Sequence, residues 1–482
     1  MGTAHPRWHD ERMTHTEVPK APSTAEGIAA GRALRARTPL RELARLGDGS
    51  RDPIGILARQ NETRVADLVP LRTERMSASP FTFYRGTAAL MAADLAQGPS
   101  SGIRVASCGD AHVANFGFYA SPARELVFDL NDFDEAAWAP WEWDVKRLVA
   151  SVVIAGQATA RDDEVVQDAA RRAVRVYARA LRAGLKLSPV QRYFTHFSAE
   201  AAVAGLDKAS RTALRSATRD ARKRTGERAA RRTTGTNADG RRVFVENPPA
   251  LTHVEPALVR SIHSLVDQYV DSANVDIRVL LQGYRVADVA RRVVGVGSVG
   301  TRCFLILLED GDGGTLLLQA KEAGHSVLVE HGGVVQPEEV EAFTAEHGQG
   351  GRVVALQRIL QAASDPFLGY LRSSADSLGG GADLYVRQFH DMKGGIDMET
   401  LDDVPFARYA EACAAVLARA HAQSPAAAAV AGYVGGGRAV AEPVLEWAYG
   451  YAALSREDYD AFLDAAAAAS APAEPAPAES AP

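Results

Sequence analysis

The stretch Cys108-Gly-Asp-Ala-His-Val-Ala-Asn115, followed by Phe128-Asp-Leu-Asn-Asp-Phe-Asp134, decides the interpretation of this chain. Asp110, placed on a loop, is able to accept a proton from a substrate hydroxyl, which makes it the candidate catalytic residue. Asn115 stands five residues further on, close enough to fold back and bind a divalent metal through its amide oxygen. Together the two residues predict a catalytic loop beside a metal site.

A carboxylate at the end of the following strand would complete that metal site. Asp132 is the best placed, Asp129 is a second candidate, and Asp134 lies nearby. Mg²⁺ prefers hard oxygen ligands, and this segment supplies several. The alternative is that these aspartates cap turns and accept hydrogen bonds from backbone amides. It applies most to Asp129 and Asp134, because the three carboxylates cannot all bind the metal.

A glycine-rich loop about two hundred residues later is the second constellation. Its sequence is Gly295-Val-Gly-Ser-Val-Gly300, and it is followed by a strand-like apolar run rather than by a helix. A dinucleotide-binding loop leads into a helix, whereas a kinase loop joins two antiparallel strands and covers phosphates. The alternative is a plain β-hairpin with a solvated lysine. The residues expected to hold nucleotide phosphates are Gly295, Gly297, Ser298, Gly300 and Lys321.

Composition limits the classes of protein to consider. The 482 residues are enough for more than one hydrophobic core, and 46% hydrophobic with 24% charged residues is ordinary for a globular protein. A net charge of -6 gives no general attraction to nucleic acid or to an anionic membrane. No apolar run approaches the roughly 18 residues of a membrane-spanning helix, and the first thirty residues lack a secretory core. Three isolated cysteines argue against a disulfide framework, so a cytoplasmic protein is expected.

Patterning along the chain predicts an order of segments. We expect disorder at both ends, because these stretches are polar or consist of Ala, Pro and Glu. The predicted segments are a disordered 1–35, a helix-rich lobe over 36–280 with a helical insertion at about 150–280, a β-rich nucleotide-binding lobe over 281–400, helices returning to the large lobe over 401–465, and a disordered tail over 466–482.

Periodicity also predicts individual elements. Arg211, Arg215 and Arg219 would share one helix face, which is either a phosphate-binding stripe or, more simply, a solvated surface. The expected helices are 80–95, one opening at Trp141, 337–347, 351–362 and 405–424, and the expected strands are 104–107, 126–130, 302–309, 315–321 and 384–389.

The motifs around Asp110, Asp132 and Trp143-Asp144 resemble the aminoglycoside phosphotransferase and choline kinase branch of the protein-kinase-like superfamily. In that branch a helix of the type Leu-Ala-x-Leu-His precedes the catalytic loop, whereas here Leu417-Ala-Arg-Ala-His421 stands near the C-terminus. The motif order is correct only when the chain is read as a circle, with Tyr385-Val-Arg-Gln388 as a hinge-like strand. Circular permutation is tolerated when the termini lie close together.

This resemblance implies a fold and a set of ligands. The implied fold is α+β and two-lobed, protein-kinase-like and circularly permuted, with a helix-rich large lobe and a small antiparallel β lobe. The implied cofactors are ATP and Mg²⁺, with Asn115 and Asp132 or Asp129 at the metal, and Gln388 of the hinge-like strand at the nucleotide. Cys108 departs from the pattern, because these phosphotransferases usually carry His there.

The chain from about Arg51 to Ser424 is also similar to a bacterial family, domain of unknown function 2252. The stretches that carry this similarity are Arg75-Met-Ser-Ala-Ser-Pro-Phe-Thr-Phe-Tyr-Arg-Gly86, Asn131-Asp-Phe-Asp-Glu135, Val294-Gly-Val-Gly-Ser-Val-Gly-Thr-Arg302, Leu318-Gln-Ala-Lys-Glu-Ala323 and Arg387-Gln-Phe-His-Asp-Met-Lys393.

The sequence does not decide the glutamate partner of Lys321 or the role of Arg85. The glutamate partner of the kinase lysine has several candidates, namely Glu338, Glu339 and Glu341 in a predicted helix and Glu322 beside Lys321. Arg85 has no kinase counterpart, and it either binds a substrate anion or pairs with a local carboxylate.

The function expected from the motifs is transfer of a phosphoryl group from ATP to an unidentified hydroxyl acceptor, with no membrane or nucleic-acid partner. The alternatives are a non-catalytic ATP-binding protein, an AMP transferase, and a metal-dependent phosphoesterase with His112 on the metal. One geometric requirement separates them. In the kinase-like interpretation, Lys321 faces the same cleft as Asp110 and Asp132, under the 295–300 loop.

Overall fold

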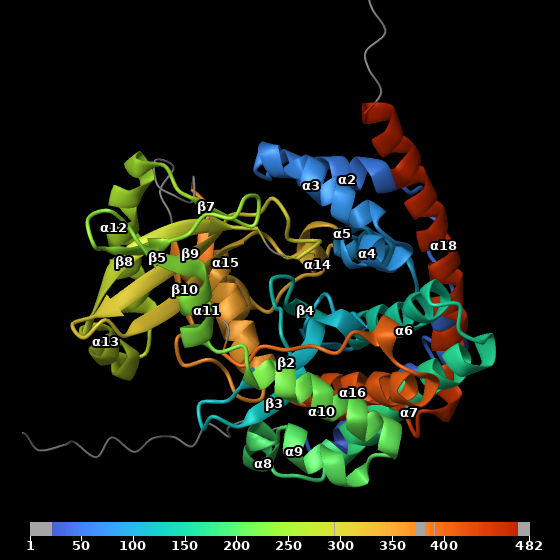
Figure 1. Cartoon of the computed structure of the whole chain (residues 1–482). Helices are drawn as coiled ribbons and strands as arrows, with labels where there is room; N and C mark the ends of the chain where they lie inside the picture. The colour runs from blue at the N-terminus through green and yellow to red at the C-terminus, as the bar shows by residue number, and fades with distance from the viewer. Residues whose placement is uncertain (1–21, 294, 373–380, 390, 471–482) are drawn as a thin grey trace, which may run out of the picture.

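The computed structural model describes residues 22–293, 295–372, 381–389 and 391–470 and combines many helices with one large antiparallel sheet, so the α+β class is confirmed (Figure 1). Short strand pairs accompany the large sheet. Within the described ranges, no helix is both long enough and apolar enough to pass through a membrane.

The large sheet has six strands in the order β11-β12-β10-β9-β8-β7. Central strand β9 has the sequence Cys-Phe-Leu-Ile-Leu-Leu-Glu-Asp. Its side chains are apolar on both faces of the sheet, and each face is covered by other elements of the fold. A tight turn joins β9 to β10, as its glycines predict. The strands are β7 Leu251–His253, β8 Tyr284–Arg292, β9 Cys303–Asp310, β10 Thr315–Ala323, β11 Gly369–Arg372 and β12 Asp383–Gln388.

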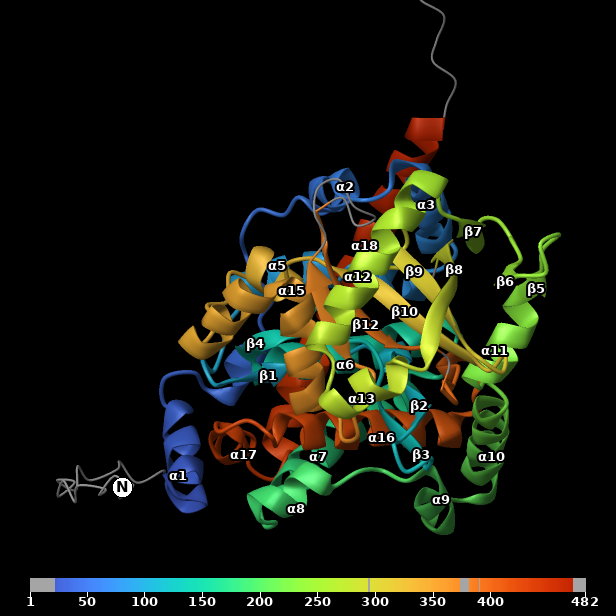
Figure 2. The same cartoon turned by 90° about the vertical axis from the view of Figure 1, so that its left-hand side faces the viewer.

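Alternate residues of β9 enter two different cores. Phe304, Ile306 and Leu308 pack with helices α12 (Pro256–Ser272) and α13 (Val275–Leu281). Leu305 and Leu307 pack on the opposite face with α11 (Gly226–Thr233). Figure 2 shows α12 crossing in front of the sheet.

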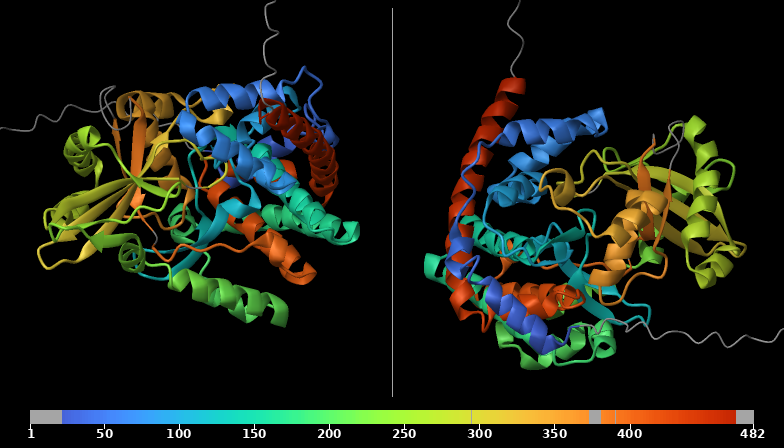
Figure 3. Two further views of the ribbon diagram at one scale, coloured as in Figure 1. Left: turned by 45° about the horizontal axis from the view of Figure 1, so that its top comes forward. Right: turned by 180° about the vertical axis from the view of Figure 1, so that it is seen from behind.

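The main core lies among helices beside the sheet, as the views in Figure 3 show. Helix α15 belongs to this core, and it is interrupted at Gly348, between the two helices expected there. The helices of this region are α1 Thr24–Leu34, α2 Pro53–Glu62, α3 Val69–Ser77, α4 Pro80–Arg85, α5 Ala88–Gln97, α6 Trp141–Ala158, α7 Asp163–Gly184, α14 Val327–Glu330, α15 Glu338–Leu360, α16 Asp403–His421, α17 Ala427–Val434 and α18 Arg438–Ser470.

Helix α6 runs through the middle of this core, and every residue from 141 to 156 is buried. Its charged residues are therefore paired with other groups. Glu142 accepts hydrogen bonds from the Ser101 backbone amide at 2.6 Å and from hydroxyl groups. The Lys146 ammonium lies 4.6 Å from the centre of the Trp447 ring. Asp144 and Arg147 point toward the 108–115 loop.

Two strand pairs flank that loop, and an insertion follows it in sequence. The expected strands at 104–107 and 126–130 are confirmed as β1 and β3. The pairs are β1 Arg104–Ser107 with β4 Ala137–Pro140, and β2 Phe116–Ala120 with β3 Leu126–Leu130. The insertion contains α8 Pro189–Phe194, α9 Ala199–Ala202, α10 Lys208–Arg222, α11, and the pair β5 Thr234–Thr236 with β6 Arg242–Phe244.

The expected disorder at the chain ends is partly wrong. Thr24–Leu34 forms α1, with Ser23 and Glu26 in a capping box, because the helix packs on α17 (Figure 2). At the other end, α18 continues to Ser470 and thus into the predicted tail. Residues 1–21 and 471–482 lie outside the described residues.

Two other expectations need correction. The single helix expected over 80–95 is two helices, because the chain turns at Gly86 and Thr87, whose hydroxyl bonds the Tyr84 carbonyl at 2.9 Å. The lobe boundary expected near 280 lies earlier in the chain. Strand β7 is part of the sheet, and helices α12 and α13 share its core rather than the helical one.

Docking of α1 on α17 can be tested at Gly432. A Cβ there would lie 2.1 Å from the Ile28 carbonyl oxygen, so Gly432→Ala should lower the free energy of unfolding by about 1–3 kcal/mol. Gly436→Ala is the control, because a Cβ at Gly436 meets no described atom within 4 Å. Equal stability of the two variants in urea would contradict the packing.

Candidate functional site

A cavity of about 650 Å³ lies where the glycine-rich loop faces the 110–115 loop. It is in the range of ligand cavities, roughly 300–1,000 Å³. Segments about two hundred residues apart in sequence line it together. The lining side chains and glycines that matter for chemistry are Arg64, Arg85, Asp110, His112, Asn115, Asp132, Asp134, Glu135, Gly295, Gly297 and Ser298.

Lys321 makes the direct connection between the sheet and this loop region. Its Nζ lies 3.1 Å from Asp132 Oδ1 and 2.6 Å from Asp134 Oδ2. The lysine side chain is 3% exposed, while those of Asp132 and Asp134 are 43% and 24% exposed. The Tyr385 hydroxyl donates to Asp134 at 2.6 Å. Asp134 is therefore fixed on both sides, and Asp132 is the more open carboxylate.

The ion pair controls the protonation of all three groups. Burial lowers the pKa of Lys321, but the charges of Asp132 and Asp134 outweigh it and hold that pKa well above its usual value. Burial raises the pKa of Asp132, yet the positive charges of Lys321 and Arg387 bring it below the usual range. The pKa of Asp134 is raised by burial and by the negative charge of Asp132. At neutral pH the site presents one cation between two carboxylates.

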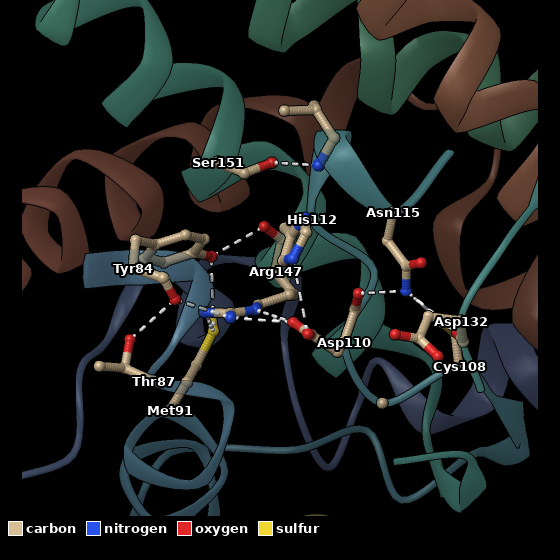
Figure 4. A network of polar contacts seen from close by, with 12 residues as sticks. Tyr84, Thr87, Met91, Cys108, Asp110, His112, Asn115, Asp132, Arg147 and Ser151 are labelled. Carbon is tan, nitrogen blue, oxygen red and sulfur yellow. Dashed lines mark hydrogen bonds and ion pairs between the residues drawn. The ribbon is translucent and has the colours of Figure 1, made fainter. Parts of the chain in front are cut away.

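Asp110 is held by a buried arginine of α6 (Figure 4). The Arg147 Nε donates to its Oδ1 at 2.9 Å, and His112 Nε2 lies 3.5 Å from its Oδ2. Arg147 is itself fixed, because it donates to the Tyr84 carbonyl at 2.8 Å and stacks on the Tyr84 ring. Burial lowers the pKa of His112 to about 4, so its imidazole is neutral at neutral pH. Asp110 thus has a single strong cationic partner.

Asn115 is oriented by the backbone of the two acidic segments. Its Nδ2 donates to the Asp110 carbonyl at 2.9 Å and to the Asp132 carbonyl at 3.0 Å. These bonds use the nitrogen side of the amide and leave Oδ1 as the atom suited to a cation. Figure 4 shows Asn115 beside Asp132. The structure therefore brings together Asp110, Asn115 and Asp132, as the sequence predicted.

Asp144 anchors the start of the 108–115 loop. Its two carboxylate oxygens accept the backbone amides of Cys108 and Gly109 at 2.7 and 2.9 Å. His421 Nε2 lies 3.1 Å from the same carboxylate, and its Nδ1 lies 2.8 Å from the Tyr177 hydroxyl. The sequence motifs Trp143-Asp144 and Ala420-His421 marked both residues as landmarks. The sequence did not show that the two residues together position the 108–115 loop, because this depends on the contact between α6 and α16.

The glycine-rich loop is tied to the helical region. It joins the antiparallel strands β8 and β9, as predicted. The Val65 amide donates to the Gly300 carbonyl at 2.8 Å, and Arg75 donates to the Gly295 carbonyl at 2.7 Å. Gly295 and Gly300 have φ values of +71° and +91°, which favour glycine. The loop is therefore held over the cavity by residues of the 64–75 segment.

The cavity has features that suit a bound phosphate group. A Cβ at Gly297 would lie 3.1 Å from the Arg85 carbonyl, so glycine keeps that space clear of a side chain. The Arg85 guanidinium lines the cavity, makes no hydrogen bond with a described residue, and feels the charge of Asp110. It is therefore placed to bind an anion, and no carboxylate among the described residues pairs with it directly.

Four predicted residues do not line the cavity, namely Gly300, Lys321, Asp129 and Gln388. Lys321 still contacts the lining carboxylates of Asp132 and Asp134, whereas Asp129 and Gln388 are engaged elsewhere. Asp129 is 1% exposed in β3, and its oxygens accept the backbone amides of Leu130 and Ala362, both at 2.8 Å. This agrees with the turn-type alternative and removes Asp129 as a metal ligand. Gln388 lines a separate pocket, and its backbone amide donates to the Asp365 carboxylate. Because Gln388 does not line the larger cavity, its predicted contact with the nucleotide is not supported.

The expected glutamate partner of Lys321 is replaced. Its carboxylate partners are Asp132 and Asp134, and Glu322 pairs with Arg302 at 3.1 Å instead. Helix α15 contributes Arg352, which donates to the carbonyls of Asp134 and Gly324 at 2.8 and 2.9 Å. Sequence reasoning missed Arg352 because a single buried arginine in a helix carries no motif.

The oxygen atoms of the cavity suit a metal ion that takes its remaining ligands from substrate phosphates and water. No group of three or more His, Cys, Asp or Glu side chains in the described ranges is arranged to hold a metal. Mg²⁺, however, is commonly bound by one or two carboxylates with substrate phosphates and water. Asp132 and the Asn115 amide oxygen supply two oxygen ligands of that kind.

A family model described as "Uncharacterized protein conserved in bacteria (DUF2252)" matches residues 64–465, which is well over half of the chain. The chain belongs to this family. The DUF2252 match includes both loops of the cavity, Lys321 and His421. No curated protein and no solved structure is significantly similar to the chain.

Removal of the Lys321 charge should destabilise the protein. Lys321→Met leaves Asp132 and Asp134 facing each other without a cation between them. The free energy of unfolding should therefore fall by about 2–4 kcal/mol, a range that already allows for the solvent exposure of Asp132. The loss should be smaller at pH 5 than at pH 8. Without Lys321, one carboxyl pKa rises above its unfolded value, so the native state gains a proton and stability as pH falls.

The matched control is the double variant Lys321→Met with Asp134→Asn. It removes one carboxylate together with the cation and should recover part of the lost stability at pH 8. Urea unfolding of the three proteins at both pH values measures this. If the single and double variants unfold alike at pH 8, the described ion pair does not control the stability of this region.

Proposed function

We propose that this protein is an ATP- and Mg²⁺-dependent phosphotransferase of protein-kinase-like fold that acts on a hydroxyl-bearing small molecule. The observation that carries the proposal is the Lys321 ion pair with Asp132 and Asp134 at a cavity shared by Asp110 and the 295–298 loop. This arrangement supports the geometric requirement that the sequence motifs set, because Lys321 contacts two carboxylates that line the cavity, although its own side chain does not line it. The two halves of the site are far apart in sequence.

The strand order supports the kinase-like assignment. In protein kinases a glycine-rich loop covers the phosphates and the lysine stands on the third strand of the sheet. Here β8, the loop, β9 and β10 follow one another as an antiparallel meander, with Lys321 on β10. The resemblance to kinases is an analogy of fold and motif, and the site chemistry carries the functional part of the argument.

Circular permutation is supported by contacts between segments that are far apart in sequence. Helix α1, which begins at Thr24, packs against α17, which ends at Val434. The chain continues after α17 as α18, and the end of α18 lies far from α1 in Figure 2. Helices α16 and α6 meet at Asp144 although they are widely separated in sequence. The cyclic motif order thus has a spatial counterpart.

Each residue of the cavity has a role that its geometry allows. The Gly295, Gly297 and Ser298 backbone and Lys321 would bind the phosphates of the nucleotide, while Asn115 and Asp132 would hold Mg²⁺, which supplies charge neutralisation when bound. Asp132 is the more exposed partner of Lys321 and so is free to turn to a cation. Asp134, held by Tyr385, keeps the lysine in place.

Asp110 would orient the acceptor hydroxyl and accept its proton. Phosphoryl transfer proceeds through a loose transition state, so positioning contributes more than strong basicity. The pair with Arg147 fixes the Asp110 carboxylate toward the cavity. The Arg85 guanidinium is placed to stabilise the charge of the transferred group, as cationic side chains do in this chemistry.

The alternatives differ in what they need from the site. Transfer of AMP would use the same residues. A non-catalytic protein would bind ATP with the same residues, but Asp110 would not act as a base. The phosphoesterase alternative needs His112 in a compact metal cluster. It is less well supported, because Asp129 faces away from the cavity and the described residues hold no cluster of that composition.

ATP with Mg²⁺ should stabilise the protein, by about 2.7 kcal/mol when the nucleotide is at a hundredfold its dissociation constant. Asp132→Ala should lose the Mg²⁺-dependent part of the thermal shift. Asp312→Ala, at an exposed hairpin turn far from the site, is the control and should behave as wild type. The absence of any shift in the wild type at millimolar nucleotide would count against the proposal.

Asp110→Asn should keep nucleotide binding and reduce turnover by roughly 10²–10⁴-fold. Turnover is followed with ATP labelled at the γ or at the α phosphate, which separates phosphoryl from AMP transfer. Arg85→Gln should also keep the fold and lower turnover, with partial recovery in Arg85→Lys. Unchanged turnover in Asp110→Asn would remove this aspartate from its assigned role.

A further inference from the structure

A second, smaller cavity is lined by Asn131, the neighbour in sequence of Asp132 in the larger cavity. Its volume is about 260 Å³, and it shares no lining residue with the larger cavity. It opens between the β2–β3 pair, the C-terminal part of α15 and the end of β12. The lining residues that matter here are Arg124, Asn131, Gln357, Asp365, Arg387 and Lys393.

Two cations in this cavity lack a carboxylate of their own. Lys393 makes no hydrogen bond or ion pair with a described residue. Arg387 donates to the Gln319 side chain and to the Asn131 carbonyl, both at 3.2 Å, and both acceptors are neutral. The positive charge of these two groups is therefore not neutralised by direct contact.

The nearby carboxylates are already engaged. Asp365 accepts the backbone amides of Gln388 and Phe367 at 2.6 and 2.8 Å. Asp391 pairs with Arg124 at 2.7 Å. Asp132, whose charge Lys393 feels, is in direct contact with Lys321 rather than with Lys393.

The electrostatic effect of this arrangement falls on Lys393. Its pKa is lowered to about 7, first by the charge of Arg387 and then by burial, with Lys321 and Arg292 adding to the repulsion and Asp132 opposing it. Two like charges held together in a cavity repel each other until an anion enters between them. An oxyanion would accept hydrogen bonds from both side chains, which are strong when both partners are charged.

We propose that Arg387 and Lys393 form a binding site for an oxyanion group, such as a phosphate or sulfate, of a small ligand distinct from the nucleotide. The cavity is slightly below the usual size range for ligand sites, so the ligand is small. This site stands on its own geometry and does not depend on the proposed phosphotransfer.

Sulfate is the probe, because its charge is constant over the pH range used. It is titrated into the full-length protein at constant ionic strength, and binding is followed by calorimetry and by thermal stability. Wild type should bind sulfate saturably at pH 7. Lys393→Gln should weaken binding about tenfold or more, and the control Lys186→Gln, at an exposed lysine outside the cavity, should not.

The pH dependence supplies a second readout. Between pH 7 and pH 9 the free Lys393 loses its proton, so sulfate affinity should fall about tenfold in the wild type. Lys393→Arg keeps its charge and should bind with little change over the same range. Asp365 does not confuse this range, because burial raises its pKa only to about 6.

Three results would overturn the proposal. They are the absence of saturable sulfate binding in the wild type, equal sulfate affinity in Lys393→Gln and wild type, and loss of sulfate binding when Mg²⁺-ATP is added. Failure of ATP to bind would leave the sulfate result intact, so the two proposals fail separately.

Discussion

The ion pair between Lys321 and the carboxylates of Asp132 and Asp134 is the constraint around which the site is built. A nearly buried ammonium loses much of its hydration, and only close carboxylates make that tolerable. The lysine belongs to the central sheet and the aspartates to the loop that follows β3, so the pair fixes how these two parts face each other. The same ion pair therefore compensates the buried charge of Lys321 and sets the positions of the groups around it.

The neighbouring contacts make that arrangement rigid on one side and open on the other. Tyr385 and Arg352 hold the Asp134 side through its carboxylate and its backbone carbonyl. Asp132 has fewer constraints and greater exposure. A site of this kind is able to exchange one partner of Lys321 for a ligand without losing the other. The tethered glycine loop limits how far the cavity opens, because its bonds to Val65 and Arg75 would have to break first.

Sequence reasoning performed well where local chemistry and periodicity act, and less well where tertiary packing decides. The strands at 104–107 and 126–130, the hairpin between β9 and β10, and the convergence of Asp110 with Asp132 followed from pattern and motif. Asp129 was misassigned because its place near the end of a predicted strand does not show that the strand is buried on both faces. The N-terminal helix was missed although Ser23 and Glu26 mark its start, because its stability also depends on contact with α17, which the local sequence does not show.

The clamp at Asp144 has a consequence for the order in which the protein matures. His421, which completes the clamp, lies 277 positions after Asp144 in the chain. Domains form during synthesis from the N-terminal side, so the 108–115 loop leaves the ribosome long before its last support exists. Lys321 also arrives late relative to the carboxylates that it neutralises. A growing or truncated chain therefore holds the acidic half of the site without its cation or its anchor, and the described contacts of the site are complete only after His421 has been synthesised.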